Sequence, residues 1–328
     1  MTLPIALTIG EPAGIGPEIA AAAWKELRET LPFFVIGDPA HIPRGVPVTE
    51  IGSPGGVRAA VASALPVLPL PFSGPRKPGE PNPRHARDVV RAIETGVKLV
   101  RENKAAALCT CPIHKKALMD GAGFAFPGHT EFLAHLARVE RVVMMLASPA
   151  LKVVPATIHV PLSEVPEALT EDLLDATLEI VVSAMQHDFG LPQPRVAVAG
   201  LNPHAGEGGK IGTEDEQVIS PVVQRWQSRG VDIRGPLSAD TMFHERARKG
   251  YDVAIAMYHD QALIPIKTVD FDRGVNVTLG LPFVRTSPDH GTALDIAGQG
   301  IADPTSLIEA LRVADQMARA RAEQNERY

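Results

Sequence analysis

Short apolar runs alternate with amphipathic segments of helical periodicity along the whole chain. The runs are rich in alanine and β-branched residues and lack clean alternation, which is typical of strands buried on both faces. We expect strands at Ile5–Ile9, Phe33–Ile36, Ala105–Thr110, Val142–Ala147, Lys152–Thr157, Arg195–Ala199 and Asp252–Met257. We expect helices at Arg84–Glu102, Thr170–His187, Asp215–Arg229 and Pro304–Gln324. The alternation predicts an α/β fold with one or two mainly parallel sheets and helices on both faces.

The composition argues against several classes of protein. The chain has 328 residues, of which 45% are hydrophobic and 21% charged, as in ordinary soluble globular proteins. The formal charge of −6 argues against nucleic acid or an anionic membrane as the main partner. The uncharged stretch 59–75 contains four prolines and is unsuited to cross a bilayer as a regular helix. An anionic substrate therefore needs a local cluster of basic side chains.

The two cysteines, Cys109 and Cys111, lie on one apolar run. Residues i and i+2 face the same side of a strand, but a lone C-x-C pair is weak evidence for a disulfide or a metal site. We expect two buried thiols and a reducing compartment, the cytoplasm.

Three histidines occupy equivalent places after apolar runs. His159 ends VVPATIH, His204 follows VAVAGLNPH, and His259 ends VAIAMYH. Open α/β sheets place their sites at the carboxyl ends of the strands, and three imidazoles converging there suit Zn²⁺ or Co²⁺. The alternative for each histidine is an ordinary hydrogen-bonded loop residue. The repeated placement of all three favours a metal site.

Acidic and glycine residues surround these histidines. Gly206, Gly208 and Gly209 follow His204 and allow close approach of the backbone to a ligand. Asp240, in GPLSADTMF, is expected to cap a helix over residues 241–248, and this role is compatible with a second one as a site carboxylate.

Basic and polar side chains suited to anions occur in two segments. Lys267, Asn276 and Arg285 lie in KTVDFDRGVNVTLGLPFVR, and Lys and Arg both bind phosphate and carboxylate groups. His129 and Thr130 lie in PGHTEF, at a glycine turn that enters a helix and exposes backbone amides. The alternatives are a solvated charged surface for the first segment and an ordinary helix cap for the second.

Two glycine-rich segments are candidates for holding a cofactor. GEPAGIGPE, at Gly10–Glu18, is neither the dinucleotide-binding G-x-G-x-x-G nor a Walker loop. HGTALDIAGQGIADP, at His290–Pro304, is expected to form a turn that leads into a short helix. Backbone amides of such a turn suit a pyrophosphate, and its histidine ring suits an adenine.

The order and length of several motifs are specific to one family. These motifs are GEPAGIGPE, CPIHKKAL, PGHTEFLA, MMLAS, GLNPHAGEGG, GPLSADT, AMYHDQ and RGVNVTLGLPFVRTSPDHGTALDIAG. Across essentially its whole length the chain resembles the family of 4-hydroxythreonine-4-phosphate dehydrogenases of pyridoxal 5′-phosphate biosynthesis, the PdxA family. The His290 segment also resembles the cofactor loop of isocitrate and isopropylmalate dehydrogenases.

The resemblance implies an isocitrate dehydrogenase-like fold of two α/β/α domains with a cleft between them. The terminal domain is expected at residues 1–125 with 275–328, and the central domain at residues 126–274. The resemblance also implies a cytoplasmic homodimer whose active site is completed by the partner subunit.

The resemblance assigns roles by motif. The metal ligands implied are His159, His204 and His259, one of them from the other subunit. The substrate-binding residues implied are His129, Thr130, Lys267, Asn276 and Arg285. NAD or NADP is expected at His290, Gly291, Thr292, Ala293 and Asp303. Asp240 and Lys267 are the two candidates for the base that accepts the substrate's hydroxyl proton.

The implied reaction oxidises 4-phosphooxy-L-threonine at C3 with NAD or NADP and then releases CO₂, giving 3-amino-2-oxopropyl phosphate. A divalent Zn, Mg or Co ion is expected to act as a Lewis acid. One alternative keeps the scaffold and oxidises threonate 4-phosphate, erythronate 4-phosphate or a cyclic diol. Another is a metal-dependent phosphate-ester hydrolase, against which the His290 turn counts. A third is a non-catalytic sugar-phosphate-binding protein, which has no need of three metal-binding histidines.

Overall fold

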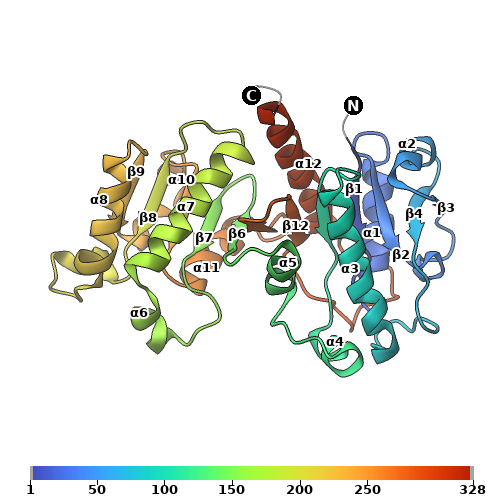
Figure 1. The fold of residues 1–328 in the computed structure, drawn as a ribbon. Helices are drawn as coiled ribbons and strands as arrows, with labels where there is room; N and C mark the ends of the chain where they lie inside the picture. The colour runs from blue at the N-terminus through green and yellow to red at the C-terminus, as the bar shows by residue number, and fades with distance from the viewer. Residues whose placement is uncertain (1–2, 326–328) are drawn as a thin grey trace. The chain divides into compact units, whose positions relative to one another are not determined.

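A computed structural model of the chain describes residues 3–325 and confirms the predicted α/β fold (Figure 1). The described residues divide into two compact units. Unit 1 comprises residues 3–142 and 281–322, and unit 2 comprises residues 143–280 with the last described residues from 323. The domain boundaries expected at 125/126 and 274/275 stay a prediction, and residues 1–2 and 326–328 of that expectation lie outside the described residues.

Unit 1 contains a parallel sheet. Its strands, in spatial order, are β3 (Val48–Glu50), β4 (Leu65–Pro69), β2 (Phe33–Gly37), β1 (Ile5–Thr8), β5 (Leu108–Thr110) and β12 (Arg285–Pro288). Its α-helices are α1 (Gly16–Leu27), α2 (Val57–Ala60), α3 (Ala86–Arg101), α4 (Lys115–Ala122), α5 (His129–Ala137) and α12 (Thr305–Asn325). Strands β1, β2 and β5 are buried on both faces, as their unalternating apolar composition predicts, whereas the edge strand β3 is largely exposed.

Helix α3 shows how the sequence attaches a helix to this sheet. Val89, Ile93 and Val97 recur at helical spacing and are buried, whereas Glu94 and Lys98 are exposed. The apolar face packs against β1, β2 and β5. Each such side chain contributes about 1.5–3 kcal/mol when it is fully buried.

Unit 2 contains a mixed sheet. Its strands, in spatial order, are β11 (Val275–Leu279), β6 (Val143–Ala147), β7 (Lys152–Pro155), β10 (Val253–Ala256), β8 (Val196–Ala199) and β9 (Ile233–Leu237). Strands β11, β6 and β7 pair antiparallel, and β7, β10, β8 and β9 pair parallel. Its α-helices are α6 (Val165–Ala168), α7 (Glu171–His187), α8 (Ser220–Ser228), α9 (Ala239–Met242), α10 (Glu245–Arg248) and α11 (His259–Val269).

The core of unit 2 uses both faces of this sheet. Val153, Ala197 and Ala254 share one cluster with Ala262 and Ile266 of α11. Because side chains alternate along a strand, their buried neighbours in sequence face the other side. The small alanine side chains of β10 let α11 lie close to the sheet, and this helix begins at His259.

Several strands were missed because their sequences are unlike ordinary strands. Strand β4 contains Pro66 and Pro69, β9 contains Gly235 and Pro236, and β12 ends at Pro288. Proline removes a hydrogen-bond donor from the backbone, and glycine weakens a strand. Neighbouring strands and burial therefore determine these elements more than local propensity does.

Three helix predictions were also wrong in detail. The helix expected at Asp215–Arg229 begins with a π-helical turn, Asp215–Ile219, before α8. Residues 241–248 form two short helices, α9 and α10, and Asp240 lies inside the first turn of α9, after the N-cap residue Ser238. The N-cap role expected for Asp240 is therefore corrected. Residues 294–298 form a turn where a short helix was expected.

The buried thiols expected from the sequence are confirmed. Cys109 and Cys111 are free and buried in unit 1. Burial raises the pKa of Cys109 to about 12 and that of Cys111 well above its usual value. Both side chains therefore stay protonated and act as small apolar groups.

Within residues 3–325, the helices are too short or too polar to cross a membrane.

A buried histidine pair in unit 1 links stability to pH. His41 and His85 lie with their ring centroids 5.4 Å apart. Burial lowers the pKa of His41 to about 4; the charges of His85 and Arg76 act in the same direction, and those of Asp38 and Asp88 oppose them. His41 is therefore neutral in the folded protein at neutral pH.

Acidification is expected to destabilise the folded chain through His41. An unfolded histidine titrates near pH 6.5, so between about pH 6.5 and about pH 4 the unfolded chain binds a proton that the folded chain does not. Stability is thus lost as the pH falls through this window, by up to about 3 kcal/mol. The variant His41→Phe, which keeps an aromatic ring beside Phe72, should lose this share of the pH dependence. Urea unfolding of both proteins near pH 7 and near pH 4.5 measures it, and equal losses in the two proteins would contradict the assignment.

Candidate functional site

Three adjacent strands of unit 2 carry the three predicted metal ligands. His159 follows β7, His259 follows β10 and His204 follows β8, and these strands lie side by side in the order β7-β10-β8. All three run parallel, so their carboxyl ends lie at the same edge of the sheet. The sequence placed each histidine after a strand, and the topology makes those strands neighbours.

Hydrogen bonds connect the loops that follow these strands. The hydroxyl group and the backbone N–H of Thr157 donate to the carbonyl of Met257 over 2.7 and 3.2 Å. The Gln261 side chain accepts from the N–H of Met257 over 2.7 Å and donates to the carbonyl of Gly200 over 2.8 Å. The His159 and His204 loops are therefore both tied to the His259 loop.

His159 and His259 share a pocket. Their ring centroids lie 5.9 Å apart, with the ring planes inclined by 40°. The pocket has a volume of about 260 Å³ and is lined by Thr157, His159, Val160, Leu162, Val165, Tyr258, His259 and Asp260. The structure thus brings two of the three histidines to the wall of one cavity.

In two of the three histidines, a carboxylate is hydrogen-bonded to the Nδ1 atom of the imidazole ring. The Nδ1 atom of His204 lies 2.7 Å from Glu207 Oε1, and the Nδ1 atom of His259 lies 2.7 Å from Asp260 Oδ1. The hydrogen bond to Glu207 raises the pKa of His204. A carboxylate at Nδ1 fixes the ring orientation and directs the second nitrogen, Nε2, outward, as in histidines that bind metals.

The loop that carries His204 has an uncommon backbone. His204, Ala205 and Glu207 adopt left-handed φ angles of 53°, 52° and 45°, and the neighbouring glycines 206, 208 and 209 do the same. Non-glycine residues in this region persist only where the surroundings hold them, and they cluster at functional sites. His159 also has a left-handed φ, of 54°.

A buried aspartate holds this loop. Asp215 is fully buried, and its Oδ1 accepts from the N–H of Leu201 over 2.8 Å. Its Oδ2 accepts from the backbone N–H and the side-chain amide of Asn202 over 3.1 and 2.9 Å. A Cβ atom on Gly200 would lie 2.6 Å from the carboxylate, so the close approach requires glycine.

Among residues 3–325 of this single chain, no three His, Cys, Asp or Glu side chains are grouped closely enough to hold a metal ion. Asp240 is exposed on α9, and its charge contributes to raising the pKa of His204. Helix α9, which carries Asp240, contacts the segment Pro203–Glu207 that carries His204, and His159 lies beside His259.

Unit 1 contains a second group of predicted site residues. Arg285, at the start of β12, is buried and donates from Nη2 to the Thr110 hydroxyl over 2.8 Å. Burial lowers the pKa of Arg285 to about 10. His129 begins α5; burial, together with the charges of Arg285 and Lys115, keeps the pKa of His129 well below its usual value. This group places positive charge beside a neutral imidazole whose Nε2 is shielded from solvent and has no hydrogen-bond partner within the described residues.

Thr130, Lys267 and Asn276 complete the predicted substrate-binding set. Thr130 lies in the first turn of α5, next to His129. Lys267 and Asn276 belong to unit 2, on α11 and β11. The Nζ atom of Lys267 lies 5.8 Å from the ring centroid of Phe271, and the Oδ1 atom of Asn276 is buried without a hydrogen-bond partner in the described part of the chain.

The predicted cofactor residues lie in unit 1. The Nδ1–H of His290 donates to the Gly291 carbonyl over 2.9 Å, and Ala293 has a left-handed φ of 42°. The carbonyl of Thr292 accepts from the N–H of Ile15 over 3.0 Å. The Asp303 carboxylate accepts hydrogen bonds from the backbone N–H and the hydroxyl group of Thr305, which begins α12. These contacts are those of a helix cap.

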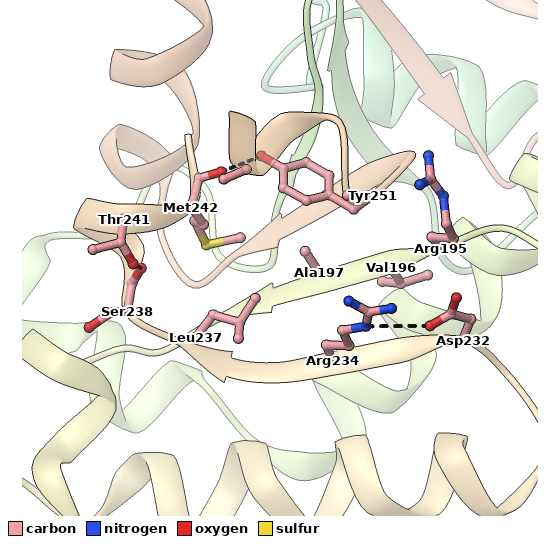
Figure 2. Close-up of a pocket in the computed structure, with 12 residues that line it drawn as sticks. Arg195, Val196, Ala197, Asp232, Arg234, Leu237, Ser238, Thr241, Met242 and Tyr251 are labelled. Carbon is pink, nitrogen blue, oxygen red and sulfur yellow. Dashed lines mark hydrogen bonds and ion pairs between the residues drawn. The ribbon is translucent and has the colours of Figure 1, made fainter. Parts of the chain in front are cut away.

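Figure 2 shows another pocket of unit 2, of about 250 Å³, beside β8, β9 and α9. The Tyr251 hydroxyl donates to the carbonyl of Met242 over 2.8 Å, and Arg234 pairs with Asp232 at 3.7 Å (Figure 2). These polar groups satisfy one another. The two pockets are similar in size, so the residues that line them decide which is the better candidate for the functional site. The pocket lined by His159 and His259 is favoured, because imidazole side chains can bind a metal ion.

Sequence reasoning noted Asp260 and Gln261 beside His259 but assigned no role to the residues that support the histidines. Glu207 and Asp260 were visible as acidic neighbours in GLNPHAGEGG and AMYHDQ, and Gln261 is in the second of these motifs. Lys115, in CPIHKKAL, was visible as a basic residue in a family motif. Asp215 gave no such signal, because an acidic residue at the start of an expected helix is ordinary.

Comparison with known proteins gives consistent matches. A family model described as pyridoxal phosphate biosynthetic protein PdxA matches residues 29–314. The chain is 61% identical over 317 residues to a 4-hydroxythreonine-4-phosphate dehydrogenase of Ruegeria sp. (strain TM1040), covering 97% of each chain. A crystal structure of a 4-hydroxythreonine-4-phosphate dehydrogenase from Klebsiella pneumoniae is similar with a TM-score of 0.86 and 36% identity, covering 97% of this chain and 100% of that one. A terephthalate 1,2-cis-dihydrodiol dehydrogenase from Burkholderia xenovorans LB400 is similar with a TM-score of 0.68 and 28% identity, covering 96% of this chain and 98% of that one.

Proposed function

The chain belongs to the PdxA family of pyridoxal phosphate biosynthetic proteins, and on this premise we propose that it is a 4-hydroxythreonine-4-phosphate dehydrogenase. The reaction is the oxidation of 4-phosphooxy-L-threonine by NAD or NADP, followed by loss of CO₂, to give 3-amino-2-oxopropyl phosphate. The observation that carries this proposal is the 61% identity to a relative of that name over 97% of both chains.

The metal of the proposed enzyme is Zn, Mg or Co, held by His159, His204 and His259. The donor set fits, because Glu207 and Asp260 occupy Nδ1 of two imidazoles and leave Nε2 for the ion. Imidazole suits Zn²⁺ and Co²⁺, and an open site also admits Mg²⁺. When bound, the ion supplies Lewis acidity that lowers the pKa of the substrate hydroxyl.

The partner of the chain is a second copy of itself, and one of the three ligands comes from that copy. Supporting this, Val160 and Leu162 are 38% and 69% exposed beside His159, which offers apolar surface for a second subunit. The proposed dimer acts in the cytoplasm, which agrees with its two free, buried thiols.

The phosphate of the substrate is proposed to bind His129, Thr130 and Arg285. Burial, together with the charges of Arg285 and Lys115, keeps the pKa of His129 low, and a fixed anion beside these two cations would offset their charges. A buried guanidinium and the backbone amides at the start of α5 suit phosphate oxygens. Lys267 and Asn276 are proposed to contact the remainder of the substrate.

The nicotinamide cofactor is proposed to bind at His290, Gly291, Thr292 and Ala293, with Asp303 close to the same segment. His290 Nε2 is buried and has no hydrogen-bond partner among residues 3–325, so it is available to a ligand. When bound, the oxidised nicotinamide would supply the acceptor for the hydride that leaves C3 of the substrate. Either Asp240 or Lys267 is proposed to accept the hydroxyl proton. Asp240 is favoured because its charge contributes to raising the pKa of His204, a proposed metal ligand.

An assay with three substrates tests the proposed function. With NAD or NADP and each metal in turn, 4-phosphooxy-L-threonine should give reduced nicotinamide and an equal amount of CO₂. Its kcat/KM should exceed that of erythronate 4-phosphate by on the order of 100-fold. Erythronate 4-phosphate carries a hydroxyl group in place of the amino group at C2, so protein groups that pair with the amino group would lose part of that interaction. A cis-dihydrodiol, the kind of substrate named for the Burkholderia relative, lacks the phosphate for which Arg285 is proposed.

Each other outcome points to a different enzyme. Faster oxidation of erythronate 4-phosphate or threonate 4-phosphate would replace the proposed substrate and keep the scaffold. Release of inorganic phosphate without reduction of nicotinamide would indicate a hydrolase and overturn the proposal.

A further inference from the structure

Three loops of unit 1 pack together around the predicted cofactor turn. The loop after β1 donates from Ile15 N–H to the Thr292 carbonyl over 3.0 Å, and the proline-rich loop donates from Gly79 N–H to the Ala13 carbonyl over 2.8 Å. A Cβ atom on Gly14 would lie 2.7 Å from the Thr292 carbonyl oxygen. A Cβ atom on Gly298 would lie 2.7 Å from Pro78. These close approaches show that the turn rests directly on the other two loops.

Glu18, in the first turn of α1, ties down the far end of the turn segment. Its Oε1 accepts from the N–H of Gly298, and its Oε2 accepts from the N–H of Gly300 over 3.2 Å. Hydrogen bonds from backbone amides to an ionised carboxylate are about twice as strong as neutral ones. Both glycines have left-handed φ angles, 83° and 70°, so this backbone conformation is specific.

Arg76 completes the arrangement from the proline-rich loop. Its Nη2 lies 3.5 Å from Glu18 Oε1, and the two side chains are only 12% and 11% exposed. Its remaining donors reach the carbonyls of Pro12, Gly14 and His41. The rigid fork of a guanidinium makes several such bonds at once, which a lysine ammonium does not reproduce.

We propose that the Arg76–Glu18 pair is a positioning device that holds the segment His290–Gly300 in the conformation that binds the nicotinamide cofactor. The inference rests on the proposed function, because it takes the cofactor to bind at this turn. Glu18 contacts the backbone of the turn segment, and Arg76, which belongs to the proline-rich loop, contacts the backbone of the loop after β1. The pair therefore acts through the turn and needs no contact with the cofactor. Ordering the turn before binding removes an entropic cost that the cofactor would otherwise meet.

The variant Glu18→Gln tests this role. It keeps one acceptor oxygen and the size of the side chain, but it loses the charge that pairs with Arg76 and turns an amide donor toward a backbone N–H. We expect backbone amides in residues 290–300 to exchange with deuterium about tenfold faster or more in the unliganded protein. We expect the Kd and the KM for the nicotinamide cofactor to rise about tenfold or more, with kcat and the substrate KM within about twofold of wild type.

Two further variants separate positioning from general damage. Arg76→Lys keeps the charge but not the fork, so it should give intermediate exchange and intermediate cofactor affinity. Glu80→Gln removes the exposed Lys77–Glu80 ion pair of the same proline-rich loop and should match wild type in every measurement. If a variant at Glu18 or Arg76 failed to fold, the other would carry the test.

The outcomes are distinguishable. Unchanged exchange in residues 290–300, or equal rises in the substrate KM and the cofactor KM, would overturn the positioning role while wild type still binds nicotinamide. Failure of wild-type protein to bind either NADH or NADPH would overturn the cofactor site itself, and with it both this inference and the proposed function.

Discussion

His204→Ala is expected to lower kcat by about a thousandfold or more and to abolish stoichiometric metal binding. A metal ion that activates the substrate hydroxyl contributes several kcal/mol to the transition state, and a thousandfold corresponds to about 4 kcal/mol. The His204 side chain is 60% exposed and contacts Glu207, so its loss removes a ligand and little packing. Metal content after dialysis and steady-state rates with 4-phosphooxy-L-threonine measure both effects.

The fold should survive this substitution, which makes the result interpretable. The left-handed φ of 53° at position 204 is somewhat more costly for alanine than for histidine, but the neighbouring Ala205 already adopts a φ of 52°. A surface substitution usually changes stability by less than about 0.5 kcal/mol. His187→Ala is the matched control, because His187 ends α7 of the same unit, and among residues 3–325 its Nδ1 is hydrogen-bonded within that helix, to Ser183. This control should keep wild-type activity and metal content.

A His204→Ala variant with wild-type turnover would show that the three histidines are not the metal site. A variant that lost activity but bound metal normally would instead assign His204 to contacts with the substrate. Glu207→Gln refines the result, because loss of the carboxylate at Nδ1 should weaken metal affinity by about 10–100-fold without removing a ligand.

Much of this site was visible in the sequence because its residues follow strands. Apolar runs before His159, His204 and His259 predicted three strand ends. The sequence did not give the spatial order β7-β10-β8, because pairing between strands far apart in the chain leaves no local pattern. The structure supplies that order, and it makes a shared site for the three side chains geometrically reasonable.

The rest of the site depends on contacts that no local pattern encodes. Asp240 was expected to cap a helix, but Ser238 and the break between α9 and α10 place it elsewhere. The roles of Glu18 and Arg76 depend on loops that lie far apart in sequence. The carboxylate of Asp215 accepts hydrogen bonds from backbone N–H groups that lie 13 and 14 residues earlier in the chain. Long-range packing, rather than propensity, therefore sets the conformation of the loops that carry the chemistry.

Asp215→Asn is expected to lower the free energy of unfolding by about 3 kcal/mol, because a fully buried carboxylate that serves three donors loses half of its acceptors. The asparagine amide would face the N–H of Leu201 or of Asn202, leaving a buried donor unsatisfied. The substitution is isosteric, so no cavity adds to the effect. Urea unfolding of the variant and of Glu216→Gln, an exposed neighbouring control, measures the difference.

The same substitution should also weaken metal binding by about 10–100-fold, because the loop it releases carries His204 in a left-handed conformation that the surroundings must hold. This second effect separates a positioning role from a purely structural one. If Asp215 only stabilised the fold, metal affinity measured well below the unfolding transition would equal that of wild type. If the fully folded variant lost metal affinity and Glu216→Gln did not, the result would show that Asp215 maintains the left-handed conformation of residues 204–209. That conformation would then be needed to position His204 as a metal ligand.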